Sequence, residues 1–475
     1  MTVNTNASLL IQNIDWLVTM DADRRVLRDA WVHITGNTVA AVGEGQASAP
    51  PADRVLDANG MLVMPGLVNT HHHFFQTLLR AVPTLQDLNL FGWLKELYLL
   101  MGSLTDEMVY VSSKVALAEL LLSGCTTAED HFYLGVNDTT FDTEIRAAQE
   151  MGVRFHLSRG SFSVGQSQGG LPPDEIVEDE DAILADCQRL VETYHDGRTG
   201  AMVRIELAPC SPFSVSPRLM RESAALARRY GVGLHTHLAE TRDEETFCLN
   251  RYGKRPVQYA ADLDWLGPDV WYAHAVHLDS SEIELLGRTG TGVAHCPSSN
   301  MRLGSGIAPI VEMLEHRVPV GLAVDGSASN DSSNMLAEAR MAMLLQRVKH
   351  GADAMAPSQA LELATLQGAR VLRRDDIGAI RPGLCADLIG FDLSRLAYAG
   401  SGHDPVAALV LCAPQPIEFS VINGQPVVLN GQILNLDLGA LIARHNELSA
   451  TMVRLAEERY GAQFRWRDWR RTWIA

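Results

Sequence analysis

The middle of the chain alternates short apolar runs with longer amphipathic stretches, and this alternation constrains the fold more than any other feature. From Leu67 to Leu372 an apolar run followed by a helical stretch recurs about eight times. The helical stretches include Val109–Leu122, Phe141–Met151, Glu178–His195 and Pro217–Tyr230, and the apolar runs are Thr126–Ala128, Arg154–Leu157, Val203–Leu207, Gly233–Leu238, Val270–His274, Gly292–Ala294 and Val318–Val324. This pattern predicts an α/β fold, the (β/α)8 barrel, whose catalytic residues follow the carboxyl ends of the strands.

Both ends of the chain resemble short strands separated by turns. Trp16–Thr19 and Val39–Val42 are strand-like near the amino terminus, and Asn423-Gly424 marks a hairpin near the other end. We therefore expect a small β-sandwich domain built from residues 1–66 and 375–435, joined to a catalytic barrel of residues 67–374. Residues 436–475 predict a helical extension, in which Trp466, Trp469 and Trp473 cover a surface or an oligomer contact.

Composition excludes several classes of protein. The 475 residues carry 39 basic and 57 acidic side chains, a formal charge of −18 that disfavours a nucleic-acid polymer and favours a small neutral substrate. The seven cysteines contain no CxxC pair, which indicates a reducing compartment and no thiolate zinc site. No apolar run approaches the roughly 18 residues of a membrane span, and no signal peptide is recognisable. We expect a soluble, cytoplasmic protein that forms a homo-oligomer and has no membrane partner.

Three consecutive histidines, His71, His72 and His73, follow an apolar run that ends near Asn69. Alternate residues of an extended chain face the same side, so His71 and His73 point together while His72 points away. Two imidazoles at that spacing can chelate one divalent metal ion. An isolated pair is more often a polar loop, so the interpretation depends on further ligands from other strand ends.

The other predicted strand ends supply such groups. Glu129, Asp130, His131 and Tyr133 follow the second strand, Cys210 the fourth, His237 and Glu240 the fifth, His274 the sixth and Asp325 the last. Several imidazoles and one carboxylate at a barrel mouth form a nitrogen and oxygen site with an open position for water. Glu240 lies three residues beyond His237, where a carboxylate can act as a general acid and base. His274 can orient the water, and Asp325 can bind the metal and accept a proton.

Each residue alone has a plainer interpretation. His235, His277 and His295 are expected to be hydrogen-bonded core residues, Asp325 a turn residue before Gly326, and Cys210 an apolar filler. If all of these interpretations were correct, the position of every one of these polar residues at a strand end would be a coincidence. The metal-site hypothesis explains all of the positions together.

Several motifs together resemble the amidohydrolase superfamily, in its nucleobase and s-triazine deaminase branch. They are PGLVNTHHHFFQTLLR, SGCTTAEDHFYL, LHTHLAET, YAHAVH, GVAHCPSSNMRLGSGIAP, VDGSASNDSSNMLAEAR and PGLCADL. The resemblance spans nearly the whole chain. It implies that His71, His73, His237 and Asp325 hold the metal, that Glu240 shuttles protons, and that His274 is the partner of the nucleophilic water, with Glu240, His274 and Asp325 as the catalytic group.

The resemblance also implies the metal content and the lining of the pocket. Binuclear members use a carboxylated lysine after the fourth strand, where this chain reads Ala208-Pro209-Cys210, so one divalent metal per chain is expected. Zinc is the expected ion and iron the alternative. Cys210 and Gln76 are expected to face the substrate, because an amide offers both a donor and an acceptor to a heterocycle. Trp93, His131 and Tyr133 are further candidates for substrate binding.

Within this branch the segments Leu157–Pro173, Leu207–Pro217 and His295–Leu303 are similar to bacterial 8-oxoguanine deaminases. The implied reaction is hydrolytic deamination of a 2-amino-4-oxo nitrogen heterocycle, with 8-oxoguanine and isocytosine as the expected substrates and ammonia as a product. An s-triazine amine hydrolase, acting on a compound such as hydroxydechloroatrazine, and a pterin deaminase are alternatives. A non-catalytic ligand-binding barrel is the alternative from a different class.

Overall fold

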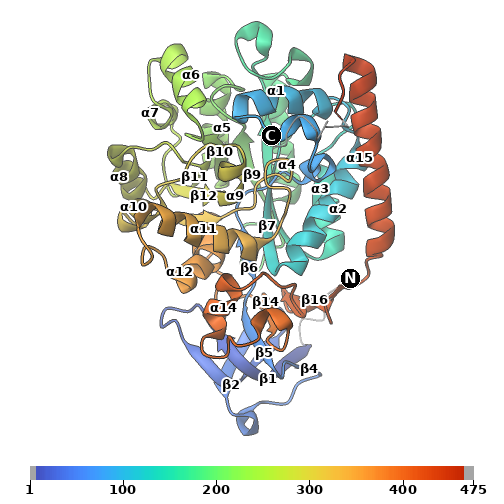
Figure 1. Ribbon diagram of the computed structural model, residues 1–475, viewed down its shortest axis with the longest axis vertical. Coiled ribbons are helices and arrows are strands. Elements are labelled where there is room, and N and C mark those ends of the chain that lie inside the picture. The colour runs from blue at the N-terminus through green and yellow to red at the C-terminus, as the bar shows by residue number, and fades with distance from the viewer. Residues whose placement is uncertain (1–6, 465–475) are drawn as a thin grey trace, which may run out of the picture.

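Parallel strands form the centre of the computed structural model, which describes residues 7–464 (Figure 1). The described residues contain one eight-stranded sheet in which every neighbouring pair is parallel and follows chain order. Its strands are β6 (Leu67–Asn69), β7 (Cys125–Phe132), β8 (Arg154–Ser161), β9 (Val203–Pro209), β10 (Gly233–Leu238), β11 (Val270–His274), β12 (Gly292–His295) and β13 (Val320–Leu322). The predicted barrel is confirmed.

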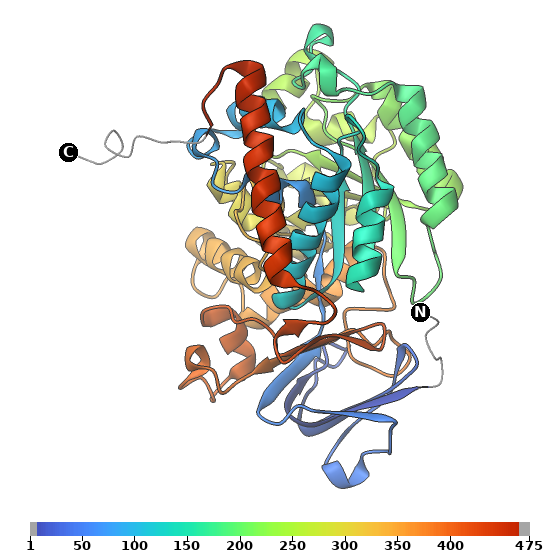
Figure 2. The same ribbon diagram turned by 90° about the vertical axis from the view of Figure 1, so that its right-hand side faces the viewer.

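Helices surround this sheet, as Figures 1 and 2 show. They are α1 (Leu90–Met101), α2 (Asp106–Leu122), α3 (Asp142–Met151), α4 (Glu180–Tyr194), α5 (Pro217–Tyr230), α6 (Arg242–Tyr252), α7 (Pro256–Ala261), α8 (Ser280–Thr289), α9 (Pro297–Arg302), α10 (Ile310–Glu315), α11 (Met335–His350), α12 (Pro357–Glu362) and α13 (Gly368–Val371). Helix α5 shows how the sequence determines their limits. The Ser216 hydroxyl accepts the amide of Leu219, Pro217 opens the first turn, and Gly231 ends the helix with a φ of 71°.

The first and last strands meet and nearly close the barrel. The amide of Thr70 donates to the carbonyl of Leu322 over 3.1 Å, and the amide of Asp325 donates to the carbonyl of His71 over 3.2 Å. These two bonds bring the residues after β6 beside the residues after β13. Residues about 250 positions apart in sequence therefore share one side of the barrel mouth.

A second sheet combines strands from both ends of the chain, which confirms the predicted β unit. Its strands are β1 (Ser8–Val18), β2 (Val26–Thr35), β3 (Thr38–Glu44), β4 (Arg54–Asp57), β5 (Met61–Pro65), β14 (Leu388–Asp392), β15 (Phe419–Ile422), β16 (Gln425–Leu429) and β17 (Gln432–Ile433). Strand β14 pairs with β5 in antiparallel register, which joins the two ends. Ile11, Ile34 and Val421 belong to one apolar cluster on this sheet, so the unit has a core of its own.

A buried ion pair connects the two sheets. Arg154 on β8 donates through Nε and Nη2 to both carboxylate oxygens of Asp387, over 2.9 and 3.0 Å. Asp387 also accepts the amide of Asn423 in the β15–β16 turn over 2.7 Å. One buried carboxylate therefore fixes the barrel strand and the terminal sheet in a single arrangement.

The C-terminal extension forms helix α15 (Leu438–Tyr460), which runs along the barrel beside α2 (Figures 1 and 2). A shorter helix, α14 (Pro405–Leu411), precedes β15. Trp466, Trp469 and Trp473 lie outside the described residues. Within residues 7–464 no helix is both long enough and apolar enough to span a bilayer.

Candidate active site

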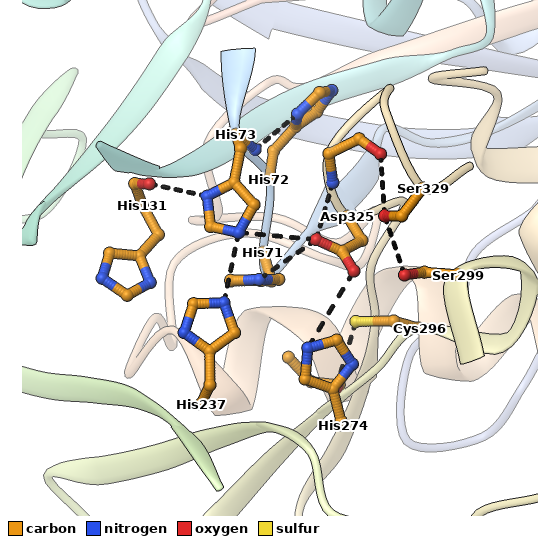
Figure 3. Close-up of polar contacts among 12 residues, drawn as sticks. His71, His72, His73, His131, His237, His274, Cys296, Ser299, Asp325 and Ser329 are labelled. Carbon is orange, nitrogen blue, oxygen red and sulfur yellow. Dashed lines mark hydrogen bonds and ion pairs between the residues drawn. The ribbon is translucent and has the colours of Figure 1, made fainter. Parts of the chain in front are cut away.

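The carboxyl ends of four barrel strands bring imidazoles and carboxylates together (Figure 3). His71 and His73 follow β6, His237 lies on β10, His274 ends β11, and Asp325 follows β13 by three residues. The Nε2 atoms of His73 and His237 are 3.1 Å apart, and Asp325 Oδ1 lies 3.4 Å from His71 Nε2 and 3.5 Å from His73 Nε2. Three nitrogens and one oxygen thus converge at distances that one metal ion can bridge.

Hydrogen bonds fix the tautomers of two of these histidines. His73 Nδ1–H donates to the carbonyl of His131 over 2.7 Å, and His237 Nδ1–H donates to the carbonyl of Cys210 over 2.8 Å. A carbonyl only accepts, so each Nδ1 carries the proton. The Nε2 lone pairs of both rings therefore point at the shared centre, as metal ligands require.

A second imidazole fixes the tautomer of His71. His235 donates from Nδ1 to the carbonyl of Trp271 over 3.0 Å, which leaves its Nε2 as an acceptor. His71 Nδ1–H donates to that atom over 2.8 Å. His71 Nε2 is buried and has no hydrogen-bond partner among the described residues. An orphaned lone pair aimed at the shared centre fits a bound cation.

His235 is a candidate site residue that sequence reasoning missed, because a buried histidine was assigned to the core. It is indeed fully buried and hydrogen-bonded. The signal that could have identified it is its position two residues before His237 on β10, since alternate residues of a strand face the same side. His72, by contrast, bonds to Ser333 Oγ over 3.0 Å and points away from the shared centre, as expected.

The charge states suit a cation. Burial lowers the pKa values of His71 and His237 well below 6.5, so both rings are neutral and their lone pairs are available. Burial alone would raise the pKa of Asp325. The close approach of His71 and the electrostatic influence of His274 outweigh burial and bring this pKa well below 3.8. The donors are therefore neutral imidazoles and an ionised carboxylate.

Glu240 lies beside this donor group but keeps its proton. Burial, with the negative charges of Asp325 and Glu244 next in importance, raises the pKa of Glu240 well above 4.5. His274 Nε2 lies 3.4 Å from Glu240 Oε2 and 3.9 Å from Asp325 Oδ2. The other ring nitrogen, Nδ1–H, donates to the side-chain oxygen of Asn300 over 3.0 Å, so Nε2 is free to accept a proton.

The backbone at these positions is strained. Ala239, His274 and Asp325 adopt φ angles of 55°, 72° and 60°, although none is glycine. The carboxylate of Glu244 accepts the amides of Ala239 and Glu240, each over 2.8 Å, and holds the turn after β10 in place. Such strain is common where a fold aims side chains at a reacting centre.

A pocket opens above the donor group. The described residues that line it are His73, Gln76, Leu90, Trp93, Leu94, Tyr98, Tyr133, Phe162, Cys210, Ser211, Phe213, His237, Glu240, His274, Leu303, Asp325 and Ser329. Four of the five predicted substrate-binding residues are among them. The fifth, His131, lies within β7 and is fully buried, stacked on His237 at a centroid distance of 4.8 Å.

Gln76 is held in a defined orientation. Its Oε1 accepts the amide of Ala328 over 3.3 Å, and its Nε2 donates to the hydroxyl of Tyr133 over the same distance. A Cβ at position 326 would lie 1.9 Å from the amide oxygen of Gln76, so a residue larger than glycine there would displace the amide from this orientation. The amide therefore presents one known face to the pocket.

The remaining wall is apolar. Trp93 anchors its indole by donating to the carbonyl of Ala328 over 3.3 Å, and burial raises the pKa of the Cys210 thiol, which stays protonated. Tyr98, Phe162 and Phe213 were not predicted from the sequence. Tyr98 lies in α1 and Phe213 in a loop, and Phe162 directly follows β8, which extends beyond the end at Leu157 that the sequence indicated. Aromatic walls with a few oriented polar groups are typical of a pocket for a flat heterocycle.

Comparisons with known proteins agree with this geometry. Residues 62–433 match the Amidohydrolase family. The chain is 51% identical over 420 residues to 8-oxoguanine deaminase from Pseudomonas aeruginosa, covering 88% of this chain and 93% of that protein. It is 38% identical over 468 residues to isoxanthopterin deaminase from an unknown prokaryotic organism, with coverages of 93% and 96%.

Solved structures show the same architecture. The crystal structure of atrazine chlorohydrolase from Arthrobacter aurescens TC1, complexed with zinc, superposes with a TM-score of 0.88. The two sequences are 32% identical, and the match covers 93% of this chain and all of that one (100%).

Proposed function

Because the chain belongs to the amidohydrolase family and is a hydrolase acting on C–N bonds, we propose that it deaminates a 2-amino-4-oxo nitrogen heterocycle. The proposed substrate is 8-oxoguanine, with isocytosine as a second substrate that shares its amidine edge. One observation carries this proposal. A single pocket holds a cation-binding donor group, a protonated carboxyl at Glu240 and the oriented amide of Gln76.

We propose that His71, His73, His237 and Asp325 hold one divalent metal ion per chain. The unpartnered Nε2 of His71 and the ionised carboxylate of Asp325 fit a cation. When bound, such an ion activates water by lowering the pKa of the water toward neutrality. Cys210 stands where a bridging lysine would be needed for a second ion, so the proposed count is one. Zinc is the proposed ion, supported by the zinc complex of the Arthrobacter aurescens enzyme, and iron is the alternative.

The proton transfers are assigned to three side chains. Glu240 begins protonated and donates its proton to a ring nitrogen while water attacks the amino-bearing carbon and passes a proton to Asp325. His274 Nε2 lies between Glu240 and Asp325 and orients that water. As the tetrahedral adduct breaks down, its hydroxyl returns a proton to Glu240, the departing amino group takes the proton held by Asp325, directly or through Glu240, and ammonia leaves.

Substrate recognition is assigned to Gln76, Cys210, Tyr133 and Trp93. The amide of Gln76 offers hydrogen bonds to the heterocycle edge, and the Tyr133 hydroxyl that it contacts extends this polar edge. The protonated thiol of Cys210 lies 3.6 Å from His237 Nδ1, near the end of the pocket where the reaction takes place. We assign His131 to support of the site, because its carbonyl holds His73.

A panel of heterocycles tests the substrate. The metal-loaded protein should release ammonia from 8-oxoguanine and isocytosine faster than from isoxanthopterin or hydroxylated s-triazines. The last two are included because relatives carry the names isoxanthopterin deaminase and triazine hydrolase. Release from a pterin or triazine alone would replace the proposed substrate but keep the reaction class. No release from any member of the panel, with metal bound, would instead support a non-catalytic binding barrel.

We further propose that the protein works as a homo-oligomer in the cytoplasm. All seven cysteines are free thiols, six of them buried, which suits a reducing compartment. Size-exclusion chromatography with light scattering measures the assembly directly. A mass of about 52 kDa in solution, equal to the 51.9 kDa of one chain, would contradict the oligomer.

A further inference from the structure

A hollow of about 620 Å³ opens at the amino ends of the barrel strands, opposite the proposed active site. It lies beside the first residues of β9 and β10 and the end of α13. Four arginines and one histidine line it: Arg204, Arg370, Arg373, Arg374 and His195. We call it the arginine hollow. Its size is within the range of small-molecule sites, roughly 300–1000 Å³.

Part of this positive charge is not neutralised by nearby carboxylates, although the whole chain carries a net charge of −18. Among the described residues Arg374 pairs with Asp376 over 2.7 Å, but Arg204, Arg370 and Arg373 form no ion pair. Arg204 donates from Nη1 to the carbonyl of Arg373 over 3.0 Å, and Arg373 donates from Nη1 to the carbonyl of Gly231 over 3.2 Å. These bonds hold two guanidinium groups in place without cancelling their charge.

Arg204 also has a hydrogen-bond donor without an acceptor among the described residues. Its Nε is buried and has no partner among residues 7–464. Burial, followed by repulsion from Arg374, lowers the pKa of Arg204 below 12.5. His195 adds a donor, because its Nδ1 accepts the amide of Ile205 over 3.1 Å and leaves the proton on Nε2. An anion in the hollow would accept from His195 and relieve the repulsion between the guanidinium groups.

Two carboxylates line the hollow and reduce its charge. Glu206 points one oxygen to His156 Nδ1, over 2.9 Å, and Asp375 is exposed at the rim. Even when Asp376, the partner of Arg374, is counted with these two carboxylates, the arginines of the hollow outnumber the carboxylates. The net negative charge of the protein repels anions and keeps the protein soluble. The local excess of guanidinium groups is therefore not needed for solubility.

We propose that the arginine hollow binds a phosphate group of a small phosphorylated molecule. Guanidinium forks match phosphate oxygens in geometry and charge, and they prefer this group to a hydrated monovalent anion. The hollow is several times larger than phosphate alone, so it also has room for the rest of such a molecule. This assignment does not depend on the chemistry proposed for the opposite mouth of the barrel.

The test uses inorganic phosphate as the probe. Phosphate is titrated into the full-length, metal-loaded protein by calorimetry, with chloride adjusted to keep the ionic strength constant. We expect saturable binding of one phosphate per chain. R204Q should weaken this binding at least about tenfold, and R370Q and R373Q should each weaken it severalfold. Arg370 and Arg373 are exposed, so their variants should fold normally.

R454Q is the matched control. Arg454 is exposed on α15 and pairs with Glu458 over 2.7 Å, so the substitution removes one positive charge far from the hollow. This variant should bind phosphate like the parent. Absence of saturable binding in the parent overturns the proposal. Equal binding by the parent, R204Q and R370Q would place the anion elsewhere. A lower melting temperature of the hollow variants with unchanged phosphate affinity would show that these arginines only cap helix ends.

Discussion

Glu240 and Asp325 are two buried carboxyl groups with opposite protonation states. Both side chains are buried, and burial raises the pKa of each. Asp325 faces three imidazoles and is held ionised, whereas Glu240 faces Asp325 and Glu244 and is held protonated. When neighbours separate the pKa values of two acids in this way, one is suited to bind a cation and the other to donate a proton.

The first prediction concerns Glu240. E240Q keeps the shape of the side chain but removes the transferable proton, so turnover should fall by about 10²- to 10⁴-fold. Because Glu240 is not among the proposed metal ligands, the variant should still hold about one metal ion per chain, as measured by elemental analysis. Turnover at the parental rate would show that another residue moves the proton.

The second prediction concerns His235. H235F removes the only acceptor of the His71 Nδ1 proton among the described residues, so His71 can rotate or change tautomer. Metal affinity, measured by competition with a chromophoric chelator, should fall about 10- to 100-fold. H295F is the control, because His295 is equally buried and neither ring nitrogen has a partner within residues 7–464. If both variants lost metal equally, general loosening of the barrel would explain the effect.

At the scale of elements, helix α15 supports the segment that carries Gln76. That segment is the short 3-10 helix η2 (Phe74–Leu79). Thr77 Oγ1 lies 3.1 Å from His445 Nε2, and the Ser449 hydroxyl donates to the carbonyl of Leu78 over 2.6 Å. The extension, predicted from the sequence only as a helix, therefore contacts the turn that orients the proposed substrate-reading amide.

The third prediction follows from this contact. H445L removes the bond to Thr77 and should raise KM by about fivefold, the equivalent of one hydrogen bond, while kcat changes less. R444L is the matched control, because Arg444 is the preceding residue and pairs with Glu107 on the surface. Steady-state kinetics of both variants measure the effect. Equal KM values for H445L and the parent would contradict a supporting role for α15.

The length of strand β7 was underestimated from the local sequence. The sequence indicated a strand over Thr126–Ala128, but β7 continues to Phe132, so Glu129, Asp130 and His131 lie within it. These polar residues are fully buried. Asp130 accepts the amide of Phe74 over 2.6 Å and so anchors the start of η2. Polar residues normally mark strand ends, and only the neighbouring strands and η2 make their burial tolerable here.

At the scale of the whole molecule, buried histidines make stability depend on pH. Burial lowers the pKa of His156 to about 4 and that of His295 to about 3, from 6.5. Below pH 6.5 the unfolded chain therefore binds protons that the folded chain does not. Their contribution to stability is full above pH 6.5 and declines as the pH falls toward 4.

The fourth prediction is a decline in the free energy of unfolding below pH 6.5. Each such histidine contributes a slope of up to about 1.4 kcal/mol per pH unit. Urea unfolding followed by tryptophan fluorescence at several pH values measures the slope. H156Q, which has no titrating ring, should flatten it. A stability that is constant from pH 6.5 to 4 would contradict neutral burial of these rings.

The sequence by itself determined the barrel, the second β unit and the strand ends where the polar residues gather. It could do so because apolar periodicity and helix capping depend on residues close together in the chain and can be recognised in the sequence. His71, His73, His237, Glu240 and Asp325 were identifiable because each lies at or just beyond the end of such a run, and the resemblance to a family assigned their roles.

Only the tertiary structure decided how these side chains are oriented and charged. Four properties depend on residues far apart in the chain. They are the contact of His235 with His71, the opposite protonation of Glu240 and Asp325, the support of η2 by α15, and the guanidinium groups of the arginine hollow that lack an ion pair among the described residues. Burial and the charge of neighbours control each of these properties. Both arise only when the strands close into a barrel, so no local pattern records them.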